Sequence, residues 1–157
     1  LGGAPVGRTT VIAAKLVAVG LIEVLQLVRL LAIATLGLGW RPAELTEPLR
    51  VAIGLILGTA TFAGMGLALA GSLRAEATLA IANGLFLVFL MLGGIVLPVD
   101  HLPGVLADVA AILPAGALSQ VLRAGFGESS SIAVPLVVLT AWAIVSVVVA
   151  VRGFRWE

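Results

Sequence analysis

The sequence has little of what the surface of a soluble protein or a catalytic site requires. Only 11% of its 157 residues are charged, against about 25% in an average soluble domain, so the charges are too few to surround a soluble core. Cysteine is absent, which excludes disulfides, thiol catalysis and thiolate metal sites. The net charge of +1 supplies no basic surface, so we expect no binding of nucleic acid.

Histidine occurs once, as His101. A metal or haem site needs several ligands and a catalytic triad needs partners, so we interpret His101 as a polar residue at a helix–loop junction. The chain also lacks a glycine-rich phosphate loop of the GxxxxGK type, which is the usual site for ATP and Mg²⁺. We therefore predict that this chain is not an enzyme and binds no cofactor itself.

The hydrophobic residues, 61% of the chain, fall into four long runs. They cover approximately residues 10–38, 51–73, 77–99 and 132–151. About 20 helical residues, at about 1.5 Å each, cross the roughly 30 Å hydrocarbon core of a bilayer. The sequence therefore predicts an all-α membrane protein, with residues 1–157 forming one transmembrane domain of four spanning helices.

The connection between the third and fourth runs is unusual because it is apolar but interrupted. Pro103 and Pro114 divide it into pieces of about ten residues, which is too short to span a bilayer. Pieces of this length more often re-enter the membrane or lie at its interface. We expect two short helices of that kind in residues 100–126.

Basic residues are unequally divided between the two sets of helix ends. One set holds Arg8, Lys15, Arg74, Arg152 and Arg155, and the other holds Arg41, Arg50 and Arg123. Because cytoplasmic loops carry the excess of Lys and Arg, the first set is expected in the cytoplasm. Both chain termini then face the cytoplasm.

Polar residues interrupt the first run. Lys15, Glu23, Gln26 and Arg29 fall within an arc of about 120° at 100° per residue. A charge at the centre of a spanning helix costs about 2.5–3.5 kcal/mol, and residues with that cost often line a wet cavity or a transport path. Glu23, Gln26 and Arg29 are thus candidates for a substrate path. The alternative is that Lys15 and Arg29 snorkel to the two surfaces while Glu23 and Gln26 hydrogen-bond to a neighbouring helix.

Glycine is frequent in the second run, at Gly54, Gly58, Gly64 and Gly66. Small residues at such spacings let helices approach closely. They serve packing within the subunit or a contact between subunits.

Residues 93–126 resemble the closing segment of ABC-2 type transporter permeases, the membrane subunits of bacterial ABC exporters of the daunorubicin-resistance kind. The shared elements are a glycine-rich turn after an apolar helix, a proline, two Leu-Pro pairs and a Leu-Arg pair before the last helix. Here they are Gly93-Gly94, Pro98, Leu102-Pro103, Leu113-Pro114 and Leu122-Arg123. The preceding charged turn, with Arg74 and Glu76, is also similar to that family.

The resemblance implies a subunit of six spanning helices, of which this chain would be the last four and not an autonomous transporter. Arg8, Arg74 and Glu76 would face an ATPase subunit. Residues 98–126 would form an extracytoplasmic re-entrant cap over the pathway. Its candidate residues are Pro98, Asp100, Pro103, Pro114 and Arg123.

By the same resemblance, the function would be ATP-driven export of a hydrophobic or amphipathic substrate, such as a drug, lipid or glycan precursor. A separate ABC ATPase subunit would bind ATP and Mg²⁺, and a second permease copy or a paralogue would complete a dimer in a bacterial plasma membrane. The alternative is a membrane anchor or assembly subunit without a transport path. The polar face of the first run favours the permease, because an anchor does not need costly polar residues there.

Overall fold

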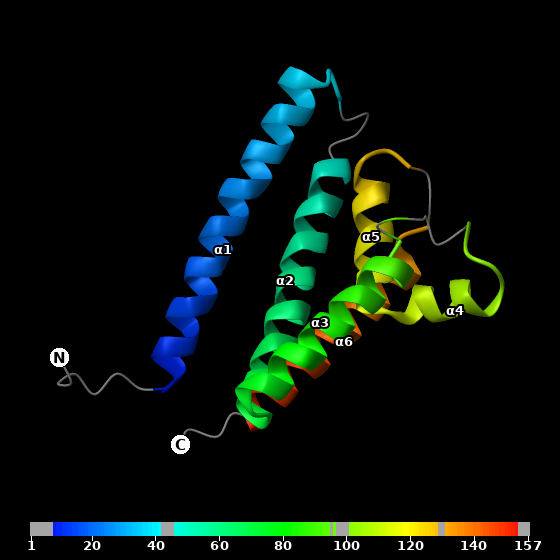
Figure 1. The fold of residues 1–157 in the computed structure, drawn as a ribbon. Coiled ribbons are helices and arrows are strands. Elements are labelled where there is room, and N and C mark those ends of the chain that lie inside the picture. Colours follow the sequence, from blue (N-terminus) through cyan, green and yellow to red (C-terminus); the bar gives the residue numbers. More distant parts are fainter. Residues whose placement is uncertain (1–7, 42–45, 95, 97–100, 129–130, 154–157) are drawn as a thin grey trace. The chain divides into compact units, whose positions relative to one another are not determined.

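The computed structural model describes residues 8–41, 46–94, 96, 101–128 and 131–153. These residues form α-helices and one short π-helix, and no strand occurs within these ranges. The elements are α1 (Arg8–Ala32), η1 (Ile33–Gly37), α2 (Thr46–Ser72), α3 (Ala75–Leu92), α4 (Val105–Ile112), α5 (Pro114–Gly125) and α6 (Ala133–Gly153) (Figure 1).

Four helical segments are long and apolar enough to cross a membrane. They are Val17–Gly37, Thr46–Ser72, Ala75–Leu92 and Ala133–Arg152. A spanning helix satisfies its backbone hydrogen bonds internally, which lipid demands because it offers no partner. The prediction of an all-α membrane protein, with four spanning helices and two short helices between the third and the fourth, is confirmed.

The contacts divide the chain into two compact units, Leu1–Arg41 and Pro42–Glu157. In the first unit, α1 continues without a break into the π-turn η1. That turn is closed by the amide of Leu38, which donates to the carbonyl of Ile33 at 3.2 Å. The first span is therefore one continuous helix. Because the two units are separate in their contacts, a single transmembrane domain for the whole chain stays a prediction.

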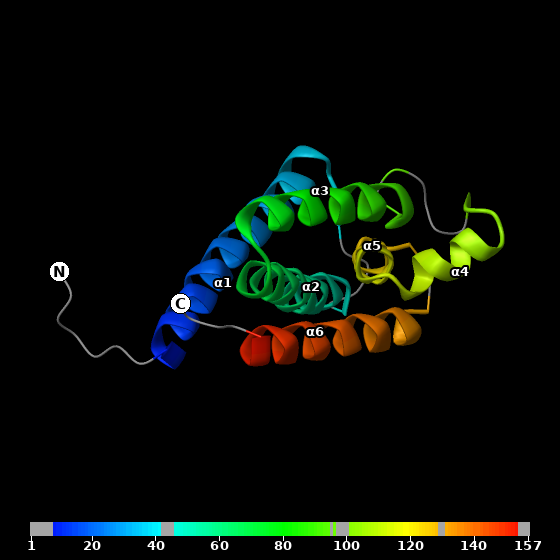
Figure 2. The same ribbon diagram turned by 60° about the horizontal axis from the view of Figure 1, so that its bottom comes forward.

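In the second unit, α2 is the central helix, with α3 on one side and α6 on the other (Figure 2). Its buried residues form one stripe: Glu47, Val51, Gly54, Gly58, Thr61 and Gly64. The largest interface is with α6, whose buried residues also follow a helical repeat: Pro135, Leu139, Ala143, Ser146 and Ala150. Small residues on both stripes bring the two backbones together, as in close-packed membrane helices.

Helices α2 and α6 approach closely at Gly64. A Cβ added there would lie 2.8 Å from the Cβ of Ser146 and 3.0 Å from the backbone nitrogen of Val147. Added Cβ atoms at Gly54 and Gly58 would instead meet side chains of α5, whereas one at Gly66 would meet nothing within 4 Å. Three of the four glycines therefore serve packing within the chain.

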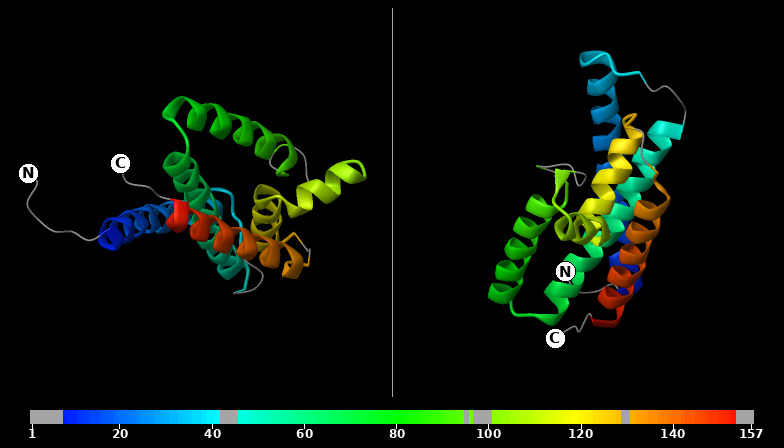
Figure 3. Two further views of the ribbon diagram at one scale, coloured as in Figure 1. Left: turned by 90° about the horizontal axis from the view of Figure 1, so that it is seen from below. Right: turned by 90° about the vertical axis from the view of Figure 1, so that its right-hand side faces the viewer.

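Helix α3 packs loosely in the second unit. None of its residues is buried, and it diverges from α2 after the short turn that joins them (Figure 3). It ends at Leu92 rather than at residue 99, because the next two residues are glycines and Gly94 has φ +73°, a conformation that most side chains avoid.

Candidate functional site

Helices α4 and α5 meet at a sharp corner. They are bent by 82° at Leu113, and Pro114 is the first residue of α5, where its missing N–H costs nothing. Gly116 completes the corner, because a Cβ at this residue would collide with the carbonyl oxygen of Ala110. Trp142 of α6 fixes the corner from outside by donating its indole N–H to the carbonyl of Ile112 at 2.9 Å.

Helix α5 lies antiparallel to the first half of α2. Gly125 packs on Val51, and added Cβ atoms at Gly54 and Gly58 would lie 2.9 Å from Val121 and 3.0 Å from Leu118, respectively. As the residue number rises along α2, that of its neighbour on α5 falls. The twelve residues of α5 therefore cover only the first half of α2 and leave its second half free on that side.

An open groove lies between α2, α3 and α5, with a volume of about 410 Å³. Each helix lines it with four residues at positions i, i+3, i+4 and i+7, which form one face of a helix. They are Phe62, Met65, Gly66 and Leu69 from α2, Ala82, Leu85, Phe86 and Phe89 from α3, and Ala115, Leu118, Ser119 and Leu122 from α5. We call this the α2–α3–α5 groove.

The groove is apolar and aromatic. The rings of Phe62 and Phe89 meet edge to face across α2 and α3, with centroids 5.7 Å apart. The one hydroxyl, that of Ser119, donates to the carbonyl of Gly116 at 2.9 Å, so its hydrogen is used within α5. A groove with apolar walls and few polar groups can contact the apolar part of a small molecule. It has no charged lining residue and thus suits an apolar or amphipathic molecule.

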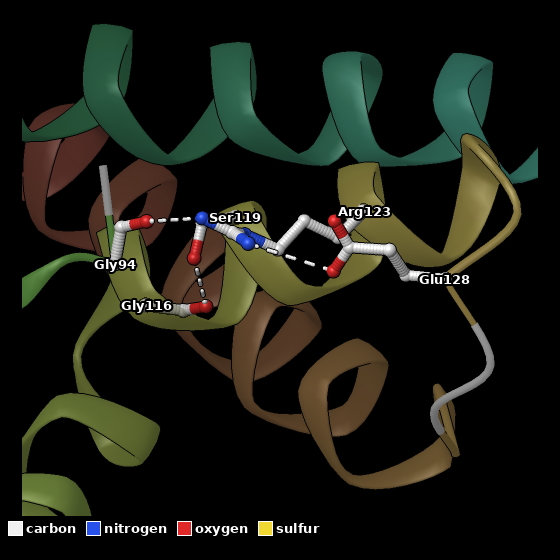
Figure 4. A network of polar contacts seen from close by, with 5 residues as sticks. All are labelled: Gly94, Gly116, Ser119, Arg123 and Glu128. Carbon is white, nitrogen blue, oxygen red and sulfur yellow. Dashed lines mark hydrogen bonds and ion pairs between the residues drawn. The ribbon is translucent and has the colours of Figure 1, made fainter. Parts of the chain in front are cut away.

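A polar network surrounds the C-terminal end of α5 (Figure 4). Arg123 donates from Nη2 to the carbonyl of Gly94 at 3.0 Å and from Nη1 to Oε2 of Glu128 at 3.5 Å. From α2, Arg50 donates to the carbonyl of Ala124 at 3.5 Å. Two arginines at this end are favourable, because the end of a helix carries partial negative charge and free carbonyl groups.

The candidate substrate-path residues lie in the first unit. Glu23, Gln26 and Arg29 share one face of α1, where Glu23 is half-buried and the other two are exposed. Within the part of the chain that the structure describes, no hydrogen bond or ion pair joins these three side chains to one another. Their role in a substrate path stays a prediction.

The candidate ATPase-facing residues lie near the ends of α1 and α3. Arg74 precedes α3 and Glu76 is in its first turn, so a carboxylate sits at the positive end of this helix. Both side chains are exposed, at the turn between α2 and α3. Arg8 is the first residue of α1, but its side chain lies outside the described part of the molecule.

The candidate cap residues are only partly described. Pro103 precedes α4, Pro114 begins α5, and Arg123 lies in the last turn of α5. Pro98 and Asp100 lie outside the described residues. His101 is exposed, and no three His, Asp or Glu side chains gather as a metal site in the residues described.

The groove-lining residues were not among the sequence-based candidates. The sequence pattern that these residues share is the i, i+3, i+4, i+7 spacing on each helix. In the sequence this spacing is hidden, because α2 and α3 are apolar on nearly all faces. Arg50 was also missed as a partner of α5, since only the fold brings it beside Ala124.

Comparison with known proteins identifies the family. The family model described as ABC-2 family transporter protein matches residues 3–152, nearly the whole chain. No curated protein and no solved structure matches the chain significantly. The match confirms the resemblance carried by residues 93–126, and it agrees with the four spanning helices and the short helical pair. The chain belongs to the ABC-2 family of transporter proteins, the membrane permeases of ABC transporters.

Proposed function

We propose that this chain is part of the permease subunit of an ATP-driven exporter that carries a hydrophobic or amphipathic molecule out of the cytoplasm. The observation that supports the cargo class is the α2–α3–α5 groove, which is apolar, aromatic and free of charged lining residues. A molecule with an apolar body fits such a surface without leaving a charge desolvated. Binding of the cargo would then depend on van der Waals contacts and on shape complementarity with the groove.

The proposed orientation places the turn with Arg74 and Glu76 in the cytoplasm. The second half of α2 lies toward that turn, so the groove opens on the cytoplasmic side of α5. Helix α5 covers the first half of α2 and closes the path toward the outside. This arrangement corresponds to a pathway that accepts cargo from within and is capped at its outer end.

The proposed assembly follows from the family. An ABC ATPase subunit binds ATP and Mg²⁺ and contacts the cytoplasmic surface near Arg8, Arg74 and Glu76. A second permease copy or a paralogue completes the dimer in a bacterial plasma membrane. On α1, Glu23, Gln26 and Arg29 offer polar positions for the head group of an amphipathic cargo.

The first experiment is purification of the tagged full-length permease in detergent, followed by an ATPase assay. A P-loop ATPase should co-purify, and its activity should respond to a fluorescent short-chain phospholipid or to a cationic amphipathic dye. A clean preparation without an ATPase would refute the exporter proposal and favour an anchor or assembly subunit.

Two glycine variants test the groove itself. Gly66 lines the groove and Gly84 does not, yet a Cβ added at either residue meets nothing within 4 Å. Gly66→Leu should therefore extend a side chain into the groove from an unhindered Cβ and reduce stimulation by the dye or lipid, whereas Gly84→Leu should leave stimulation unchanged. Equal stimulation in both variants would show that cargo does not use this groove.

A further inference from the structure

Two faces of the groove converge at one end. On α3 the lining residues 82, 85, 86 and 89 continue the helical repeat to Gly93, and on α5 the lining begins at Ala115. An added Cβ at Gly93 would lie 2.7 Å from the Cβ of Ala115, so α3 and α5 touch there. The α3 and α5 walls of the α2–α3–α5 groove therefore meet at this contact.

The other contacts of α3 at this end, with α2, α4 and α5, are apolar or between small residues. Helix α3 has no buried residue, and its contact with α2 includes the edge-to-face pair of Phe62 and Phe89. Only one polar contact within the described residues joins the turn after α3 to α5: the hydrogen bond from Arg123 Nη2 to the carbonyl of Gly94 at 3.0 Å. Figure 4 shows the Arg123 side chain extending along α5 from its last turn toward Gly94.

The geometry of Arg123 suits a link between α5 and the turn after α3, which we call the clasp. Its guanidinium is a planar fork with several donors, and here one nitrogen faces Gly94 while another faces Glu128 at 3.5 Å. Glu128 is held at the end of α5, because its backbone N–H donates to the carbonyl of Arg123 at 3.1 Å. The fork is therefore directed toward Gly94 by a partner that belongs to the same end of α5.

We propose that Arg123 is a positioning residue that holds the end of α3 against α5 and so sets how far the α2–α3–α5 groove is closed. With the clasp intact, α3 stays on Ala115 and the groove is narrow at this end. With the clasp released, α3 separates from α5 and the groove widens. The consequence for cargo rests on the proposed function, whereas the position of α3 can be measured without cargo or ATP.

The test uses electron-spin distance measurements on the full-length permease. Residues 1–157 contain no cysteine. With any cysteine outside them replaced by serine, nitroxide labels can be attached at Met91→Cys on α3 and Ile56→Cys on α2, where the native side chains are 58% and 66% exposed. In Arg123→Gln the distance distribution should shift to longer values and broaden. Arg123→Lys keeps a charged donor but not the fork, and should give a smaller shift.

Arg50→Gln is the matched control. Arg50 binds the same end of α5 through Ala124, and within the described residues it makes no hydrogen bond to α3 or its following turn, so its loss should leave the distribution unchanged. An unchanged distribution in Arg123→Gln, or an equal shift in Arg50→Gln, would overturn the proposal. If Arg123→Gln is not monodisperse, an unchanged distribution in Arg123→Lys overturns it. A longer distance in Arg123→Gln, combined with an ATPase activity that neither lipid nor dye stimulates, would support the role of Arg123 and count against the proposed function.

Discussion

The packing of α2 against α6 gives a quantitative prediction from two alanine substitutions. At Gly64, the added methyl would lie 2.8 Å from the Cβ of Ser146, 2.9 Å from its carbonyl carbon and 3.0 Å from the nitrogen of Val147. Two of these three atoms are backbone, so no rotamer change can relieve the contact and the helices must move apart. Overpacking of this kind typically costs about 1–3 kcal/mol.

Gly66 is the internal control on the same helix. A methyl at this residue meets nothing within 4 Å, so Gly66→Ala brings only the gain in helix propensity, about 0.5–1 kcal/mol. Gly64→Ala brings the same gain, which cancels when the two variants are compared. Gly64→Ala should therefore be less stable than Gly66→Ala by about 1–3 kcal/mol.

Gly58 provides an intermediate point. A methyl there would lie 3.0 Å and 3.2 Å from the two terminal methyls of Leu118, and the end of a flexible side chain can move where backbone cannot. Gly58→Ala should fall between the other two variants.

The assay is equilibrium unfolding of the full-length permease in mixed micelles of mild detergent and SDS, followed by circular dichroism. The three variants should unfold in the order Gly64→Ala, Gly58→Ala, Gly66→Ala as SDS is raised. If Gly64→Ala is as stable as Gly66→Ala, the α2–α6 contact is not as close as the structure has it, and packing between subunits becomes the better account of the glycines.

Three further predictions concern the corner, the polar face and the orientation. Trp142→Phe removes the indole donor to α4 and should cost about 1 kcal/mol in the same unfolding assay; no loss would mean that the bond does not form. Glu23→Gln and Arg29→Leu should each lower dye- or lipid-stimulated ATPase activity at normal expression, and unchanged stimulation in both would remove this face from the path. Cysteines at Arg74 and Glu128 should react with an impermeant maleimide from the cytoplasmic and the outer side, respectively, and reaction from one shared side would contradict the proposed orientation.

The secondary structure of this protein could be predicted from sequence because a bilayer imposes local rules. A segment must be long enough to cross the hydrocarbon core and must satisfy its own backbone, and both conditions can be tested in a single run of residues. The break at Pro114 was predicted for a similar reason, since proline cannot sit inside a helix without removing a hydrogen bond. The end of α3 was placed too late, because the apolar run continues past Gly93 and Gly94 although the helix does not.

The α2–α3–α5 groove was not predicted from the sequence, and the predicted polar residues of α1 stay a prediction. A sequence shows the costly polar residues of α1, because a charge in lipid stands out against apolar neighbours. It does not show the groove, because lipid is as apolar as the lining side chains and places no selection on which face is apolar. The twelve lining residues therefore look like any other part of their helices.

What the sequence determined by itself was the class of the protein, the number of spanning helices and the short helical pair between the last two. These depend on hydrophobic length and on the covalent restraint of proline, which act within one segment. The tertiary structure alone decided which glycines meet backbone, that α5 covers only the first half of α2, and that Arg123 reaches Gly94. These contacts join residues far apart in the chain, and they depend on how small and large side chains fit between helices.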